Sequence, residues 1–241
     1  MRKRVSQSDS TLSINPRFGL SDKSFQLDCC GIYARGHNML IIAIAGGSGS
    51  GKTSVAERLA KALSVSHHCE ILCEDSYYKT LTAEQHANIS DVNFDRPDAL
   101  DHQQLRLDLL QLKQGHDVNI PIYCYKTHSR LTDTRAMQAC DVLILEGLHI
   151  LHRDTLLPLY DLTVFVDTPT DVRLARRLAR DVTERQRTEE SVHYQFNTTV
   201  EPCHQEFIQP SKENAAVTIN GTLPFDVFMP ALIERVASKL N

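Results

Sequence analysis

The sequence predicts an α/β fold in which a mostly parallel central sheet carries helices on both faces. Three observations support this prediction. Apolar strand-like runs alternate with amphipathic helical stretches along the chain. A glycine-rich stretch separates the first apolar run from a helix, and acidic residues follow several of the later runs. Ligands of such folds bind at the carboxyl ends of the strands, so the residues just past each strand are the candidates for function.

The first strand is expected at residues 39–45, and the segment after it, residues 46–53, reads GGSGSGKT. This is the pattern G-x-x-x-x-G-K-[ST], in which glycines let the backbone fold around phosphates with several N–H groups pointing inward. The helix that starts here adds the positive end of its dipole. Lys52 supplies a point charge for the β- and γ-phosphates, and Thr53 supplies a hydroxyl for Mg²⁺. The motif predicts binding of a nucleoside triphosphate with Mg²⁺, and its strand and helix argue against a Gly/Ser linker.

The next elements follow from apolar spacing and from helix end signals. A helix over 52–64 has Val55, Leu59 and Leu63 on one face, and a short second strand covers 71–73. Residues 79–97 are polar and irregular. A helix over 98–114 is expected to be capped by Asp98 and to end at Gly115.

The second half of the chain continues the alternation of strands and helices. Extended pieces broken by Pro121 predict a small hairpin within 117–126. Further strands are expected at 141–147, 161–167 and 215–219, and further helices at 170–182, at about 188–202 and at 225–240. There is no internal repeat and no clear boundary of a second globular domain.

Two acidic residues at strand ends are candidates for chemistry. Asp75 follows the second strand, where a carboxylate can accept a proton from a substrate hydroxyl or hold a water on Mg²⁺. Glu146 ends an apolar run that is typical of a buried strand, and fits a second acid that positions Mg²⁺ through water. The alternatives are that Asp75 only caps a turn and that Glu146 is a surface acid.

Six arginines recur from the helix at 170–182 onward, and arginine is the residue best suited to grip a transferring phosphoryl group. For most of them a solvated basic face with local acidic partners is the stronger interpretation, so two or three are expected to contact a ligand. They are Arg173, Arg176, Arg177, Arg180, Arg185 and Arg187.

Composition excludes several classes of function. The 241 residues include 26 basic and 30 acidic side chains, a net charge of −4 that argues against a dominant nucleic-acid surface. No apolar stretch is long enough for a membrane span. The seven cysteines form no C-x-x-C pair, which favours a reducing, cytoplasmic setting.

Residues 1–38 differ from the remainder, because they are polar and rich in Ser and Arg. They lack the apolar core of a secretory signal, and their aspartates argue against a mitochondrial presequence. We expect a poorly ordered extension over 1–38 and one compact domain over 39–241. Met39, at the first core strand, is a possible start of that compact domain.

Several longer motifs resemble the uridine kinases of the phosphoribulokinase/uridine kinase family. Their order and spacing hold over roughly residues 40–222, which makes the set more specific than the phosphate-loop motif alone. Beside that motif they are DSYYK at 75–79, NFDRPDA at 93–99, PIYCYKTHSR at 121–130, EG at 146–147, VDTPTDVRLARR at 166–177 and QPSK at 209–212.

This resemblance implies a P-loop kinase with a small β-hairpin over the substrate and a helical lid, which transfers a phosphoryl group from ATP to the 5′-hydroxyl of uridine or cytidine. It implies that Asp75 is the catalytic base, with Lys52 and Arg187 in the catalytic set, and that Thr53, Asp75 and Glu146 serve the Mg²⁺ site. The ATP-binding set would be Gly46, Gly47, Ser48, Gly49, Ser50, Gly51, Lys52, Thr53, Ser54, Arg180 and Arg185. The nucleoside-binding set would be Tyr78, Asp95, Tyr123, Tyr125, His128, Arg177, Arg187 and Gln195. The family also suggests a homotetramer.

The chain departs from the family pattern at Cys124, where the family commonly has Asp, and at Gln186, where the lid usually carries Gly between two arginines. These departures bear on substrate preference and on lid closure. Related kinases acting on another riboside or on a phosphosugar, and a non-catalytic nucleotide-binding regulator, stay open as alternatives. A GTPase is disfavoured because no N-K-x-D motif occurs, and no signature segment of a transport ATPase is found.

Overall fold

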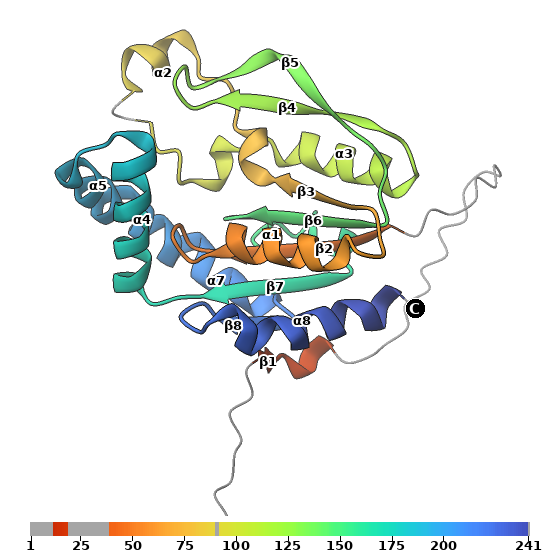
Figure 1. Ribbon diagram of the computed structural model, residues 1–241. Helices are drawn as coiled ribbons and strands as arrows, with labels where there is room; N and C mark the ends of the chain where they lie inside the picture. Colours follow the sequence, from red (N-terminus) through yellow and green to blue (C-terminus); the bar gives the residue numbers. More distant parts are fainter. Residues whose placement is uncertain (1–11, 19–38, 90–91, 241) are drawn as a thin grey trace, which may run out of the picture.

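The computed structural model describes residues 12–18, 39–89 and 92–240, and its centre is a six-stranded sheet (Figure 1). The strand order is β1-β8-β7-β2-β6-β3, and every neighbouring pair is parallel except β1 with β8. The strands are β1 Leu12–Ile14, β2 Leu40–Gly46, β3 Cys69–Cys73, β6 Val142–Gly147, β7 Leu162–Asp167 and β8 Val217–Asn220. The predicted mostly parallel sheet is confirmed.

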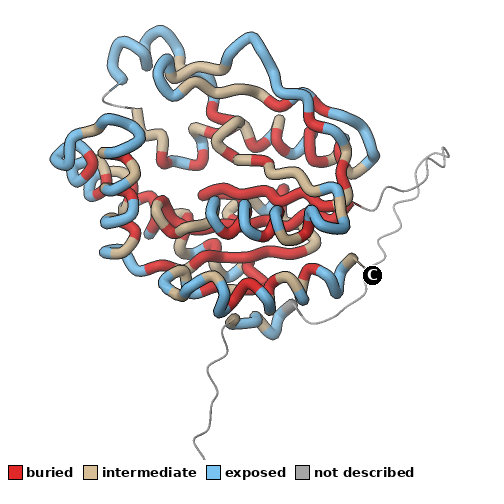
Figure 2. The backbone as a smooth tube through the Cα atoms, in the orientation of Figure 1, coloured by how far each residue is buried: buried red, intermediate tan, exposed pale blue. Residues whose placement is uncertain are grey.

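The sheet is covered on both faces, and this explains its sequence pattern. Every residue of β2 and β6 is buried (Figure 2), as expected for parallel strands that read as continuous apolar runs. On one face pack α1 (Lys52–Leu63) and α8 (Phe225–Leu240). On the other face pack α3 (His102–Lys113) and the segment that follows β6.

A separate two-stranded hairpin is formed by β4 (Val118–Cys124) and β5 (Ser129–Met137). It lies at the top of Figure 1, with α3 between it and the central sheet. The expected hairpin within 117–126 therefore contains only the first strand. The second strand was missed because β5 is largely exposed and polar, so it lacks an apolar alternation. Arg130 ties the hairpin to the site, since its guanidinium donates hydrogen bonds to the carbonyl oxygens of Tyr78 (2.9 Å) and Tyr77 (3.0 Å).

The lid region starts with α4 (Thr170–Arg185) and α5 (Glu189–Gln195), at the left of Figure 1. The predicted helices at 170–182 and about 188–202 correspond to these elements, although the second continues in short pieces of varying pitch. Those pieces are Phe196–Val200, α6 Glu201–Cys203, His204–Ile208 and α7 Gln209–Ser211. Other short helices whose bounds lie within the described residues are Pro16–Phe18, Glu74–Tyr77, α2 Ala83–Ala87, Pro97–Ala99, Leu157–Leu159 and Lys212–Asn214.

The expected cap of the helix at 98–114 was wrong. Asp101, not Asp98, caps α3, because its side chain accepts a hydrogen bond from the backbone N–H of Gln104 (3.0 Å). Leu100 is extended and bridges to Tyr78, so the helix cannot begin before it. Asp98 lies instead in the short 3₁₀ turn Pro97–Ala99, with an exposed side chain.

Within the expected poorly ordered extension over 1–38, Leu12–Ile14 pairs with β8 as an edge strand, and the remainder apart from residues 15–18 lies outside the described residues. Cys29 and Cys30 also lie outside them, and the five described cysteines are free. Among the described helices, none combines the length and apolar character needed to span a membrane.

The burial of β6 generates a stability prediction. Ile144 is fully buried in the core on the α1 face of the sheet, so Ile144→Ala should lower the free energy of unfolding by about 2–5 kcal/mol through lost burial and a residual cavity. Val65 is 88% exposed, and Val65→Ala should change it by less than about 0.5 kcal/mol. Urea denaturation of both variants measures the difference, and equal midpoints would contradict this packing.

Candidate active site

The phosphate loop joins β2 to α1 and requires glycine at two of its positions. Gly49 and Gly51 have φ angles of +78° and +97°, in the region that favours glycine. A Cβ atom on Gly49 would also collide with the carbonyl oxygen of Arg173. The loop therefore folds back at the N-terminus of α1, where unpaired N–H groups and the helix dipole favour an anion.

Lys52 faces two carboxylates at the ends of neighbouring strands. Its ammonium nitrogen lies 3.7 Å from Oε2 of Glu146, the penultimate residue of β6. Burial alone would lower the pKa of Lys52, but Glu146 and Asp75 raise it above its ordinary value, so the ammonium stays charged. Oε2 of Glu146 is buried, faces Lys52 and makes no hydrogen bond, so it can still accept one from a water or contribute to binding a metal cation.

Asp75 lies in the 3₁₀ turn that follows β3 and receives a hydrogen bond from the hydroxyl of Tyr125 on the hairpin (3.0 Å). Its pKa is raised to about 6, chiefly by burial and also by the charges of Glu146 and Glu74, against the lowering effect of Lys52. A carboxylate with a pKa this close to neutrality is a better proton acceptor than an ordinary aspartate.

Aromatic rings form one wall of the cleft. Tyr78 lies 5.1 Å from Tyr123, and Tyr123 lies 5.3 Å from Tyr125, between ring centroids. The ring of His128 stacks on Phe94 at 4.7 Å. The hydroxyl of Tyr123 is buried without a hydrogen-bond partner, so this wall offers both apolar faces and an unused polar group to a planar ligand.

Asp95 stands above this wall and is 9% exposed. Its carboxylate accepts a hydrogen bond from the hydroxyl of Thr199 (2.9 Å), and its backbone N–H donates to Oδ1 of Asn93 (2.9 Å). Burial raises its pKa, while Arg177 opposes this effect.

The lid reaches the phosphate loop through arginine. Arg177 donates hydrogen bonds to the hydroxyl of Ser48 (2.8 Å) and to Oε1 of Gln195 (2.8 Å). Arg187 donates to the same oxygen of Gln195. The three lid residues that the family resemblance assigned to the nucleoside pocket therefore lie in contact with one another.

A fully buried carboxylate, that of Asp181, gathers the lid arginines. Four guanidinium groups lie within 4 Å of its oxygens: those of Arg177 (3.5 Å), Arg180 (2.9 Å), Arg185 (3.4 Å) and Arg187 (3.6 Å). One negative charge thus opposes four positive charges, and the excess makes this side of the cleft attractive to polyphosphate. The sequence pattern indicated only local acidic partners for these arginines, because helical spacing does not show that Asp181 faces inward.

The backbone of Gln186 closes the end of α4 in the left-handed region, with φ 54° and ψ 35°. Its N–H donates to the carbonyl oxygen of Asp181, as in a helix C-cap that glycine usually provides. The departure from the family pattern at this position therefore places a residue with a Cβ atom where glycine has no steric cost.

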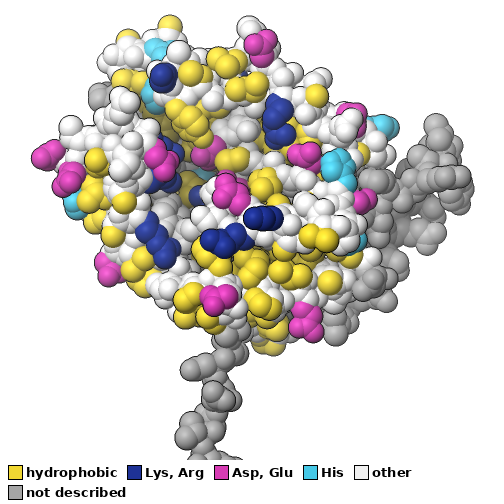
Figure 3. Space-filling model, viewed as in Figure 1, with side chains coloured by type: hydrophobic (Ala, Val, Ile, Leu, Met, Phe, Trp, Pro, Cys, Tyr) yellow, Lys and Arg dark blue, Asp and Glu magenta, His cyan; other side chains and the backbone are white. Residues whose placement is uncertain are grey.

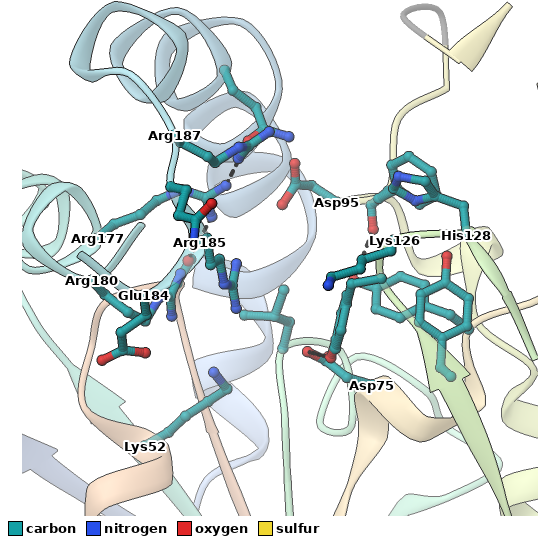
Figure 4. A pocket seen from close by; sticks show the side chains of 18 residues that line it. Lys52, Asp75, Asp95, Lys126, His128, Arg177, Arg180, Glu184, Arg185 and Arg187 are labelled. Carbon is teal, nitrogen blue, oxygen red and sulfur yellow. Dashed lines mark hydrogen bonds between the residues drawn. The ribbon is translucent and has the colours of Figure 1, made fainter. Parts of the chain in front are cut away.

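These groups line one cleft of about 600 Å³ (Figure 4). In that view the arginines of the lid lie on one side, Asp95, Lys126 and His128 on the other, and Lys52 and Asp75 at the base. The space-filling view shows acidic and basic side chains gathered around this hollow (Figure 3). From the predicted set the cleft contains Ser48, Lys52, Asp75, Tyr78, Asp95, Tyr123, Tyr125, His128, Arg177, Arg180, Arg185, Arg187 and Gln195.

Other predicted residues lie beside the cleft lining. Thr53 and Ser54 are exposed in the first turn of α1. Glu146 does not line the cleft itself but contacts Lys52, which does. Four of the six arginines line the cleft, and the expectation that two or three of them contact a ligand stays a prediction. Arg176 instead supports the phosphate loop by donating to the carbonyl oxygen of Ser50 (3.2 Å), whereas the guanidinium of Arg173 donates to the carbonyl oxygen of Thr168 and to Glu201.

The sequence reasoning missed five residues that line the cleft. Phe94 lies inside the NFDRPDA motif and next to Asp95, so the motif itself was a usable signal. Lys126 likewise lies inside the PIYCYKTHSR motif, and Gln186 was noted only as a departure from the family pattern in the lid. No local pattern points to Leu148 or Glu184.

Residues 41–226 match the model of the phosphoribulokinase/uridine kinase family. The chain belongs to this family. The match covers the sheet from β2 to β8, the hairpin and the lid, and thus every residue that lines the cleft. The similarity of the sequence motifs to this family is therefore confirmed over the whole functional region.

Curated proteins similar to this family member carry uridine kinase names. It is 38% identical to uridine-cytidine kinase B of Dictyostelium discoideum, over 83% of this chain and 82% of that protein. It is 44% identical to the uridine kinase of Shewanella frigidimarina, over 75% and 86%. It is 38% identical to the chloroplastic uridine/cytidine kinase UKL1 of Arabidopsis thaliana, over 98% of this chain but only 48% of that protein. The chain thus spans less than half the length of some curated relatives.

Solved structures support the fold. The phosphoribulokinase of Rhodobacter sphaeroides matches with a TM-score of 0.56 at 14% identity, over 78% of this chain and 74% of that one. A putative fructose transport system kinase of Silicibacter matches with a TM-score of 0.62 at 18% identity, over 72% and 86%. The predicted P-loop kinase fold is confirmed.

The arrangement around Asp181 generates a second prediction. Asp181→Asn should lower the free energy of unfolding by about 1–3 kcal/mol, because the guanidinium groups lose their buried partner. Asp171 is an exposed acid in the first turn of the same helix, and Asp171→Asn should cost less than about 1 kcal/mol. Chemical denaturation compares the two, and an equal or larger loss for Asp171→Asn would refute the central position of Asp181.

Proposed function

We propose that the chain phosphorylates the 5′-hydroxyl of uridine or cytidine with ATP as donor. The observation that carries this proposal is the single cleft in which a phosphate loop and an aromatic wall flank one carboxylate. Asp75 borders both the phosphate loop and the aromatic wall. Its charge raises the pKa of Lys52, and its carboxylate accepts a hydrogen bond from the hydroxyl of Tyr125. A donor and an acceptor alcohol bound on the two sides would meet at this group.

The donor side is suited to a triphosphate. The loop 46–53 offers backbone N–H groups, Lys52 offers a charged ammonium, and Arg180 and Arg185 face the cleft from the lid. We place ATP here, with its γ-phosphate between Lys52 and Asp75. The lid that covers this side would exclude water and so protect ATP from hydrolysis.

The acceptor side suits a neutral nucleoside better than a phosphosugar. The rings of Tyr78, Tyr123 and Tyr125 offer stacking surface for a flat base, and His128 offers a ring nitrogen for its edge. Burial, and the charges of His86 and Arg187, lower the pKa of His128, so its ring is neutral at pH 7 and can donate or accept. Asp95 is placed to accept hydrogen bonds from the ribose hydroxyls.

In the proposed reaction the 5′-hydroxyl gives its proton to Asp75, its oxygen bonds the γ-phosphorus, and the bond from that phosphorus to the β–γ bridging oxygen breaks. The products are the nucleoside monophosphate and ADP. Lys52 and the lid arginines, Arg187 among them, counter the charge on the transferring group. Arg177 and Gln195 hold the lid against Ser48 while this happens.

Magnesium fits the same site. The buried Oε2 of Glu146, which makes no hydrogen bond, the hydroxyl of Thr53 and the carboxylate of Asp75 are hard oxygen donors beside the place proposed for the phosphates. Bound there, Mg²⁺ would supply Lewis-acid neutralisation of the phosphate oxygens. Homotetramer assembly and a cytoplasmic location also stay proposals, and both come from the family resemblance and the cysteine pattern.

A substrate panel tests the proposed function. Purified protein with Mg²⁺ and ATP should convert uridine or cytidine to the monophosphate, and should leave ribulose 5-phosphate and nicotinamide riboside largely unchanged. Chromatography of the nucleotide products measures this. Binding of ATP without any phosphorylated product would indicate the non-catalytic regulator, and turnover of a phosphosugar would indicate the sister kinase.

The third prediction isolates the base. Asp75→Asn should leave ATP binding largely intact and lower kcat by at least about 10², because the amide cannot take the proton. Asp98→Asn, at an exposed acid in the turn before α3, is the control and should keep normal turnover. Fluorescence titration with a nucleotide analogue and a coupled ADP assay give the two readouts. Near-normal kcat in Asp75→Asn would reject this role.

A further inference from the structure

A buried polar cluster adjoins the proposed acceptor site and is formed by Glu74, His102 and His149. Glu74 and His149 are both 0% exposed, and His102 is 8% exposed. Glu74 immediately precedes Asp75, and His149 follows β6 by two residues. None of these three side chains lines the cleft, so neither the donor nor the acceptor site accounts for them.

The hydrogen-bond directions in this cluster are determined by its chemistry. Arg153 Nε donates to Nδ1 of His102 (3.2 Å), so Nδ1 is an acceptor and the hydrogen of the neutral ring is on Nε2. Nε2 of His102 then donates to Oε1 of Glu74 (2.6 Å). Burial alone would raise the pKa of Glu74, but the hydrogen bonds from the His102 ring and from the backbone of His149 lower it overall, so Glu74 is an anion.

His149 connects this anion to the acceptor loop. Its backbone N–H donates to Oε2 of Glu74 (2.9 Å), and Nε2 of its ring lies 2.9 Å from the carbonyl oxygen of Asp95. A carbonyl oxygen only accepts, so Nε2 carries the hydrogen. Burial lowers the pKa of His149 to about 4, in keeping with the neutral tautomer, and its Nδ1 has no partner.

The two carboxylates that the acceptor must contact come from different parts of the chain. Asp75 is fixed to the end of β3, whereas Asp95 lies between the short helix α2 and the turn Pro97–Ala99, outside the sheet. The ring of His149 provides a buried bond from the sheet-side core to the backbone of Asp95. A displacement of about 1 Å in a reacting group can cost about 10² in rate. A bond that holds Asp95 in place can therefore affect how the acceptor is oriented toward Asp75.

We infer that His149 is a positioning residue that sets the place of Asp95, the proposed ribose-binding carboxylate, relative to the base Asp75. It does so through its ring bond to the backbone of residue 95 and its main-chain bond to Glu74. The inference rests on the proposed function, since it concerns the same acceptor site.

A purely structural role for His149 predicts something different. Its ring packs near His152 (6.4 Å) and Phe207 (6.2 Å), so any substitution there is expected to reduce stability. Only a positioning role predicts a selective effect on the acceptor, with the donor side unchanged. The separation of KM for uridine from KM for ATP therefore distinguishes the two roles.

The experiment compares His149→Leu with His149→Gln in the full chain. Leucine removes the ring N–H donor. We expect KM for uridine to rise about tenfold, which corresponds to the loss of one hydrogen bond. KM for ATP should stay within about twofold of that of the unmodified protein. Glutamine places an amide nitrogen near the position of Nε2, and should restore KM for uridine to within about threefold of the unmodified protein. Should His149→Leu not fold, His149→Asn replaces it, because its shorter amide cannot reach residue 95.

Tyr160→Phe is the matched control. It removes a hydrogen bond from the same region, that of the Tyr160 hydroxyl to the carbonyl oxygen of Ile150 (3.2 Å), and this hydroxyl is not hydrogen-bonded to Asp95 or Glu74. It should leave both KM values unchanged. A double variant of His149→Leu with Asp95→Asn should be less impaired in KM for uridine than the product of the single effects.

Three results would overturn the inference. The first is an unchanged KM for uridine in folded His149→Leu or in its Asn replacement, and the second is a KM for uridine in His149→Gln as high as in His149→Leu. The third is a KM for uridine in the double variant equal to the product of the two single effects. Each requires that the unmodified protein phosphorylates uridine. Failure of that activity would reject the proposed function instead, so the two failures are distinguishable.

Discussion

The register of the parallel strands around β2 is the constraint on which the cleft depends. Ala45 of β2 pairs with Gly147 of β6, and Cys73 of β3 pairs with Glu146. Three strands therefore end at the same level, and each is followed by a functional segment: the phosphate loop, the turn of Asp75 and the segment of His149. A slip of one residue would exchange the faces of a strand and move Glu146 away from Lys52. The contact of 3.7 Å between them is thus a consequence of backbone pairing.

The charges of the cleft are divided between its base and its lid. The base combines Lys52 with two carboxylates. Their charges raise the pKa of Lys52, whereas burial, together with the charge of Glu146, raises the pKa of Asp75. The lid carries four arginines around one buried Asp181. A polyphosphate between the two would neutralise the excess positive charge of the lid, so binding of a donor and closure of the lid are expected to favour each other.

The sequence predicted those parts of the molecule that local patterns encode. Apolar strands, the phosphate loop and the acids at strand ends were found because each depends on neighbours along the chain. The cap of α3 was misplaced from Asp101 to Asp98, because the extended conformation of Leu100 depends on its bridge to Tyr78. The central position of Asp181 and the cluster of Glu74 also depend on contacts between distant segments. The family resemblance supplied most acceptor residues that spacing alone could not identify.

The left-handed conformation of Gln186 bears on how the lid moves. Glycine at this position reaches many conformations at little cost, so a lid that carries it can open and close about a flexible point. A residue with a Cβ atom has fewer alternatives, and the cost of its left-handed conformation, about 1–2 kcal/mol, must be offset by the lid contacts. Those contacts are the bonds of Arg177 and Arg187 to Gln195 and the ion pairs of Asp181. The lid of this chain is therefore held in shape by the side-chain contacts next to Gln186. A glycine at this position would let the backbone of the lid move more freely.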